Sequence, residues 1–151
     1  MKRVKKLQLA QLDRKIAALA TVPEPPSNGW ISAIRTTIGM SFRQLAKRLK
    51  IAPQNAQAFE KRELEGSITI KNLRTIAQAL NMKLVYGFIP QSGSLEKMIE
   101  DQAMSVAKKI VLRTDTTMKL EDQGVSKERR DQAILELAEE IKRNIPRYLW
   151  D

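Results

Sequence analysis

The chain has 151 residues, of which 42% are hydrophobic and 29% charged, so it has enough apolar material to fold around a core. It contains no cysteine and no histidine, which excludes disulfides and thiolate metal sites and removes the commonest general base; we expect neither an enzyme nor a cofactor. The net charge of +10 is uneven, because residues 1–94 carry 16 Lys and Arg against 5 Asp and Glu, while residues 95–151 carry 11 against 12.

The basic N-terminal half favours a polyanionic partner such as nucleic acid, although charge that only maintains solubility is the alternative. A membrane surface is disfavoured, because large apolar residues do not crowd one face of the basic stretch. The first residues are basic, but no apolar stretch long enough for a signal peptide or a membrane span follows them. We therefore expect a cytoplasmic protein.

The first predicted part, residues 1–29, is a basic helix followed by a linker. Apolar residues recur at intervals of three and four over residues 2–20, which predicts one helix with one apolar face. Residues 21–29 contain three prolines and a glycine, a composition typical of a semi-rigid linker. The apolar face of the helix consists of Leu9, Leu12, Ile16 and Leu19.

The second part, residues 30–82, is predicted to contain two short helices joined by a tight turn. Ser41 and Gln44 have the spacing of a capping box, in which each side chain bonds the other residue's backbone amide, so a helix starts here. Lys50 falls in the turn, where glycine is more usual, and Pro53 occupies the first turn of the next helix. The inner faces of the two helices and the turn consist of Leu45, Ala46, Leu49, Ile51, Ala56 and Phe59.

Residues 83–94 are predicted to form a strand and a linker, and residues 95–151 a helical region for a partner or for dimerisation. The strand covers residues 83–90, which are rich in β-branched and aromatic side chains, and it needs a partner: a second copy or a strand elsewhere. A long helix is expected from Leu95, and a second helix capped by Ser126. Pro146 is expected to end that helix and to leave residues 147–151 as a short tail.

The pattern in the second part resembles the Cro/XRE family of helix-turn-helix repressors. The resemblance is carried by Ser41-x-x-x-Leu45-Ala46-x-x-Leu49-x-Ile51-x-x-x-x-Ala56-x-x-Phe59-Glu60. The stretch Ile68-Thr69-Ile70-x-x-Leu73-x-x-Ile76-Ala77-x-Ala79-Leu80 is similar to the family's following helix. The resemblance implies a mainly α, lambda-repressor-like five-helix bundle, here with an N-terminal helix, one short β-strand and a C-terminal helical extension.

In this family the start of the second helix faces the bases of double-stranded DNA, which implies base-reading roles for Gln54, Asn55, Gln57 and Ala58. Gln and Asn can pair bidentately with adenine. Phosphate contacts are implied for Arg43, Lys47, Lys61 and Arg62, with an ordinary solvated face as the alternative. Two residues depart from the family's contact pattern: Phe42, where many relatives have a phosphate-contacting Gln, and Pro53, whose side chain donates no bond. We expect Glu60 to brace the turn.

A narrower resemblance covers nearly the whole chain. The basic first helix and the stretches Gly29-Trp30-Ile31, Leu84-Val85-Tyr86 and Tyr148-Leu149-Trp150-Asp151 are similar to the family called mobile mystery protein A. The resemblance implies an antitoxin-like bacterial regulator paired with a Fic-domain, AMP-transferring toxin. Residues 117–122 resemble the inhibitory Fic motif, with Thr117 and Glu121 as its key residues; a solvated helical face is the alternative.

Together these patterns predict a nucleoid-associated transcriptional autorepressor and antitoxin, acting as a homodimer on paired half-sites. The alternative is a helical protein-binding module that inhibits a partner enzyme without specific DNA binding.

Overall fold

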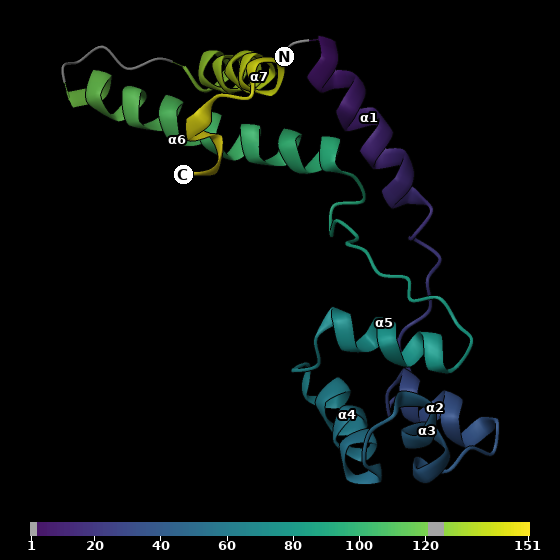
Figure 1. The fold of residues 1–151 in the computed structure, drawn as a ribbon. Coiled ribbons are helices and arrows are strands. Elements are labelled where there is room, and N and C mark those ends of the chain that lie inside the picture. The colour runs from purple at the N-terminus through teal and green to yellow at the C-terminus, as the bar shows by residue number, and fades with distance from the viewer. Residues whose placement is uncertain (1–2, 121–125) are drawn as a thin grey trace. The chain divides into compact units, whose positions relative to one another are not determined.

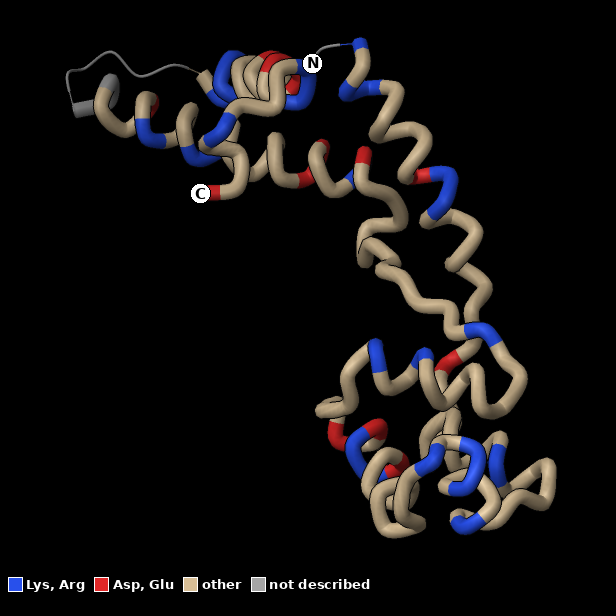
Figure 2. Tube along the Cα trace, in the orientation of Figure 1, with Lys and Arg blue, Asp and Glu red and all other residues tan. Residues whose placement is uncertain are grey.

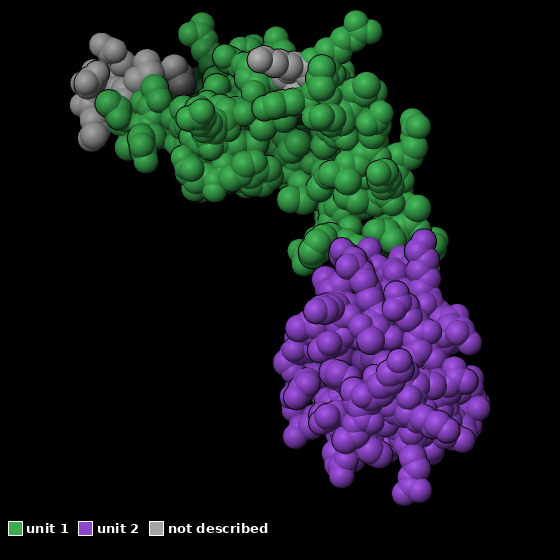
Figure 3. Space-filling model, viewed as in Figure 1, with its two compact units in different colours: residues 1–21, 87–151 green, residues 22–86 purple. Residues whose placement is uncertain are grey.

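The structure is a computed structural model that describes residues 3–120 and 126–151. All the regular structure in this part of the chain is helical (Figure 1), which confirms the predicted mainly α class. Two compact units form, residues 22–86 and residues 1–21 with 87–151 (Figure 3), so the predicted first part divides between them. The helices are α1 (Arg3–Ala17), α2 (Trp30–Thr37), α3 (Phe42–Leu49), α4 (Pro53–Glu65), α5 (Ile70–Ala79), α6 (Leu95–Leu120) and α7 (Lys127–Asn144), followed by the 3₁₀ helix η1 (Arg147–Trp150).

Local signals set the helix ends in the unit of residues 22–86. The predicted capping box forms: Ser41 Oγ accepts a hydrogen bond from the Gln44 amide at 3.2 Å, and Gln44 Oε1 accepts one from the Ser41 amide at 2.8 Å. Lys50 ends α3 in the left-handed conformation, with φ 57°, and Pro53 is the first residue of α4. Gly66, with φ 74°, ends α4. The predicted turn between α3 and α4 is therefore confirmed.

The core of this unit joins α2, α3, α4 and α5. Ala46 and Ala56 are fully buried, and their small side chains let α3 and α4 approach closely. All six predicted inner residues lie in this core or pack against it. The buried members are Ile31, Leu45, Ala46, Ala56 and Ile76.

The strand predicted over residues 83–90 is not formed in the single chain. These residues have no regular secondary structure, and the described part of the chain contains no other strand with which they could pair. A β-strand needs a neighbour to satisfy its backbone groups, which explains the difference. Residues 30–82 also hold four helices, α2 to α5, one fewer than the implied five-helix bundle.

In the other unit, α6 and α7 pack against each other along a row of alanines. Ala103, Ala107 and Ala138 are nearly or fully buried at their contact and allow close packing. The carboxylate of Asp115 is buried and accepts a hydrogen bond from Arg130 at 3.1 Å. The remaining core side chains are Ile134, Ile141 and Leu149.

Helix α1 packs on this unit by one side only. Leu9, Ile16 and Leu19 are half-buried, whereas Leu12 is 49% exposed, so the predicted apolar face forms in part. Asp13 lies on the same side and accepts hydrogen bonds from the first two amides of α6, at 2.7 and 3.1 Å. A carboxylate at a helix N-terminus satisfies unpaired amides and interacts favourably with the helix dipole, so Asp13 couples α1 to α6.

The short tail predicted for residues 147–151 packs on the core of this unit. Pro146 follows the end of α7, but residues 147–150 then form η1, and Leu149 is fully buried against the α6–α7 core. Gln102 Nε2 donates to the Leu149 carbonyl at 2.8 Å. The apolar surface that Leu149 buries against α6 and α7 stabilises this segment. None of the described helices has the length and hydropathy needed to cross a lipid bilayer.

Candidate nucleic-acid interface

The outward face of α4 presents amides near its start and a lysine one turn further on. Gln54, Gln57 and Lys61 are exposed and spaced by three and four residues, so they share one face. Asn55 is exposed beside them, and Ala58 is half-buried. Because α4 begins at Pro53, these amides lie in its first turns, where a helix entering a major groove presents its side chains to the bases.

The four predicted phosphate-contacting cations are all exposed. Arg43 and Lys47 lie on α3, and Lys61 and Arg62 on α4. Figure 2 shows Lys and Arg in blue along the chain. Among the described residues, only Lys61 of these four has an ion-pair partner, the exposed Glu65 at 3.9 Å. Such an exposed pair is weak, so all four cations are available to a polyanion.

A buried ion pair behind α4 connects it to α2. The guanidinium of Arg35 donates through Nε to Glu60 Oε1 and through Nη2 to Glu60 Oε2, the latter at 3.3 Å. Its Nη1 donates to the Met40 carbonyl at 2.8 Å, and its Cζ lies 3.8 Å from the centre of the Phe42 ring. Glu60 therefore links α4 to α2, whereas it was expected to brace the turn between α3 and α4. Phe42 packs on Arg35.

Glu63 makes a second connection from α4 to the start of α2. Its two carboxylate oxygens accept hydrogen bonds from the amides of Trp30 and Ile31, both at 2.9 Å. Gly29 adopts φ 84°, and a Cβ at this position would lie 2.8 Å from Glu63 Oε1. The missing side chain at Gly29 therefore leaves room for the carboxylate that caps α2.

Sequence reasoning missed Arg35 and Glu63 as members of this support. Both are charged residues on short helices, and helical spacing assigns them to a face without identifying the group that they meet. The glycine directly before Trp30 was the one signal of a close approach.

The other predicted site is described only in part. Thr117 lies on α6, is exposed and donates from Oγ1 to the Arg113 carbonyl at 3.1 Å, while Glu121 lies outside the described residues. The structure therefore leaves the Fic-inhibitory role of this pair as a prediction.

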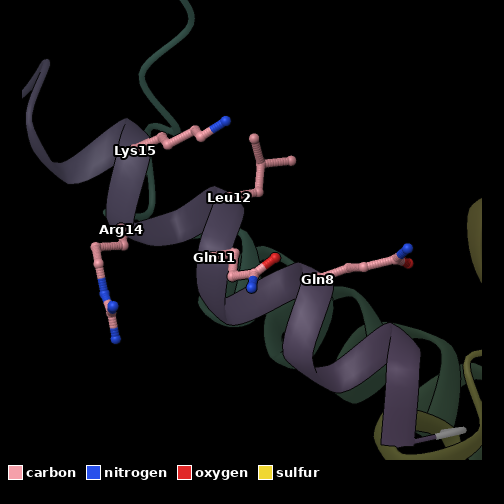
Figure 4. A pocket seen from close by; sticks show the side chains of 5 residues that line it. All are labelled: Gln8, Gln11, Leu12, Arg14 and Lys15. Carbon is pink, nitrogen blue, oxygen red and sulfur yellow. The ribbon is translucent and has the colours of Figure 1, made fainter.

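A surface hollow of about 440 Å³ lies over α1. The residues that line it all come from this one helix, and Figure 4 shows Arg14 extending away from Lys15. Side chains of one helix face do not enclose a substrate, so this hollow is no site for chemistry. Across the described residues, no cluster of three or more acidic side chains is placed to hold a metal ion. The lining residues are Gln8, Gln11, Leu12, Arg14 and Lys15.

Comparison of the chain with protein-family models, with curated proteins and with solved structures gave no match.

Proposed function

We propose that residues 30–82 form a Cro/XRE-type helix-turn-helix domain that binds double-stranded DNA in a sequence-specific manner. The observation that supports this most is the arrangement of α3 and α4. A capped helix, a left-handed Lys50 and a proline-started α4 place exposed amides at the front of a helix that is braced from behind. A rigid support is what a recognition helix needs, because base readout depends on positions held to within a fraction of an ångström.

The charge of the unit supports the same proposal. Residues 22–86 contain ten Lys and Arg against four Asp and Glu. Two of the four acids, Glu60 and Glu63, are engaged by Arg35 and by backbone amides. The surface field of this unit is therefore strongly positive, as phosphate neutralisation with counterion release requires.

In this proposal Gln54 and Asn55 read bases, and the exposed cations set the position of the domain on the backbone. An amide side chain donates to and accepts from adenine at the same time, which discriminates against the other bases by about 1–3 kcal/mol. Arg43 and Lys47 from α3, with Lys61 and Arg62 from α4, contact phosphates and contribute affinity without sequence information.

The test is selection of duplexes from a random DNA pool by the purified full chain, followed by affinity measurements on the selected and a shuffled duplex. Gln54→Ala and Asn55→Ala are expected to weaken binding to the selected duplex about 5- to 150-fold. Gln78→Ala, an exposed glutamine on α5, is the matched control and should leave the affinity unchanged. If all variants bind both duplexes with the same affinity, the proposal of specific DNA binding is wrong. The alternative of a protein-binding module is then favoured.

The antitoxin part of the proposal rests on the resemblance to mobile mystery protein A. Its test is the AMP-transfer activity of a Fic-domain partner in the presence of the full chain and of Glu121→Ala. Inhibition by the unsubstituted chain and not by Glu121→Ala supports an inhibitory role of Glu121. Equal inhibition by both assigns that role to another surface.

A further inference from the structure

Residues 82–90 form an exposed apolar segment, and the backbone of residues 83–89 within it has no hydrogen-bond partner in the described chain. Val85, Tyr86 and Phe88 are 68%, 59% and 85% exposed. Extended chain that is rich in aromatic and β-branched residues and lacks backbone partners is a ready template for another strand.

Gly87 marks a close contact of the segment with its own chain. A Cβ built on Gly87 would lie 2.2 Å from a methyl group of Leu19. Val85 and Ile89, which share a side with Gly87 in extended chain, are nonetheless 68% and 53% exposed. In extended chain Leu84, Tyr86 and Phe88 all point to the other side. The ring of Tyr86 lies 5.8 Å from the guanidinium carbon of Arg74, and Phe88 has the highest exposure of the large apolar side chains described.

We infer that residues 82–90 pair with the same segment of a second copy, as an antiparallel two-stranded ribbon centred on Tyr86. The ends of the segment set the register. Asn81 is left-handed, with φ 56°, and Pro90 lacks an amide donor, so extended pairing is confined between them. The midpoint of 82–90 is residue 86, and pairing about it uses the whole length.

This register is self-complementary. Leu84 lies opposite Phe88 of the second copy, and Tyr86 lies opposite Tyr86, which gives an unbroken row of large apolar side chains on one face. The single charge, Lys83, lies opposite Ile89, and the two Lys83 side chains stand at opposite ends of the ribbon. A two-fold axis through Tyr86 makes the contact isologous, so pairing stops at two chains. The backbone edges that face each other are then both paired.

The absence of cysteine from the chain allows a direct test of the register by single-cysteine variants. Opposed residues of an antiparallel pair have Cα atoms about 4.5–5.5 Å apart, within the range of a disulfide. Tyr86→Cys is therefore expected to form a disulfide-linked dimer at least tenfold faster than Val85→Cys, which faces Gly87. Lys83→Cys, about 20 Å from its counterpart, should be equally slow. Equal rates at the three positions, or a faster rate at Val85→Cys, would overturn this pairing.

Sedimentation of the cysteine-free chain provides the second readout. The natural chain, 17.2 kDa as a monomer, is expected to sediment as a dimer at micromolar concentration. Phe88→Asp should raise the dimer dissociation constant at least tenfold, whereas Leu135→Asp, an equally apolar and 51% exposed position on α7, should not change it. A monomer at tens of micromolar, or a dimer that Phe88→Asp leaves intact, overturns the inference. Neither experiment contains DNA. A negative result for dimerisation is therefore distinct from a negative result for the proposed DNA binding.

Discussion

Two charged side chains, Arg35 and Glu60, are buried in the core of the unit of residues 22–86 and connect α4 to α2. Arg35 and Glu60 are 9% and 8% exposed, and each satisfies the other. Burial removes water from both groups, so neither tolerates the loss of its partner. Phe42 and the Met40 carbonyl complete the surroundings of the guanidinium.

Arg35→Ala is expected to lower the free energy of unfolding of this unit by about 3–5 kcal/mol, because it leaves the Glu60 carboxylate buried and unpaired. The measurement is urea denaturation followed by Trp30 fluorescence. Lys61→Ala is the control: it removes an exposed pair with a 3.9 Å separation and should cost less than about 1 kcal/mol. Equal losses for the two variants would show that the buried pair is not what holds α4.

Gly29→Ala is expected to destabilise the unit more than Gly66→Ala does. Both glycines have positive φ, 84° and 74°, but their backbone conformations differ. Gly66, with ψ 16°, lies in the left-handed region, where another residue costs about 1–2 kcal/mol, whereas Gly29, with ψ 159°, lies in a region essentially restricted to glycine, where the cost reaches about 3 kcal/mol. At Gly29 the new methyl group also meets Glu63, 2.8 Å from Oε1, and displaces the cap of α2, which adds about 1 kcal/mol. Urea midpoints of the two variants give the comparison. In a Glu63→Ala background the difference should shrink by about that 1 kcal/mol while the backbone part remains; an unchanged difference would mean that the carboxylate does not contribute to it.

At the scale of elements, α1 and α6 are joined through one carboxylate. Asp13 accepts from the Leu95 and Glu96 amides, in addition to the Ser94 hydroxyl that accepts from the Lys97 amide at 3.0 Å. Since α1 has no fully buried side chain, this cap and the half-buried Leu9 and Ile16 hold it in place. Small losses at this contact therefore have large effects on α1.

Asp13→Ala is expected to increase hydrogen exchange of the α1 amides and of Leu95 and Glu96, by about fivefold for a loss near 1 kcal/mol. The measurement is exchange followed by mass spectrometry on the full chain. Asp101→Ala is the matched control, because Asp101 lies on α6 and its one ion-pair partner among the described residues is exposed Lys97, at 3.0 Å. Unchanged α1 exchange in Asp13→Ala would mean that apolar contacts alone hold this helix.

The elements that sequence reasoning predicted correctly are those whose signals are local. Ser41, Pro53 and Ser126 mark helix starts through their own backbone neighbours, and the spacing of apolar residues gave the inner faces of α3 and α4. The strand of residues 83–90 is not formed in the single chain, and the burial of Leu149 within the short tail of residues 147–151 was not predicted. Their conformations depend on what packs against them, a missing strand partner in one case and the site of Leu149 in the other.

The candidate interface was predictable in the same sense. Exposure of Gln54, Asn55 and the flanking cations followed from helical spacing. The supporting contacts of Arg35 and Glu63 did not, because they join residues 25 and more than 30 positions apart. Such contacts depend on how helices pack in three dimensions.

At the scale of the whole molecule, the chain builds two separate cores. One joins residues of α2 to α5, and the other joins α6, α7 and η1. Each has its own fully buried large side chains, Leu45 and Ile76 in the first and Ile141 and Leu149 in the second. The two tryptophans of the chain also divide between the units, with Trp30 in the first and Trp150 in the second.

Separate cores predict separate unfolding, and each tryptophan reports one of them. Ile76→Ala is expected to destabilise the unit of residues 22–86 by about 2–5 kcal/mol, through lost burial and a cavity, and to leave the other unit unchanged. Ile141→Ala should have the opposite selectivity. The measurement is urea denaturation by fluorescence in Trp150→Phe and Trp30→Phe backgrounds, which isolate Trp30 and Trp150 respectively. If either core variant shifts both transitions equally, the units unfold as one cooperative body; a shift confined to one reporter means that the unit of residues 22–86 is stable without the α6–α7 core.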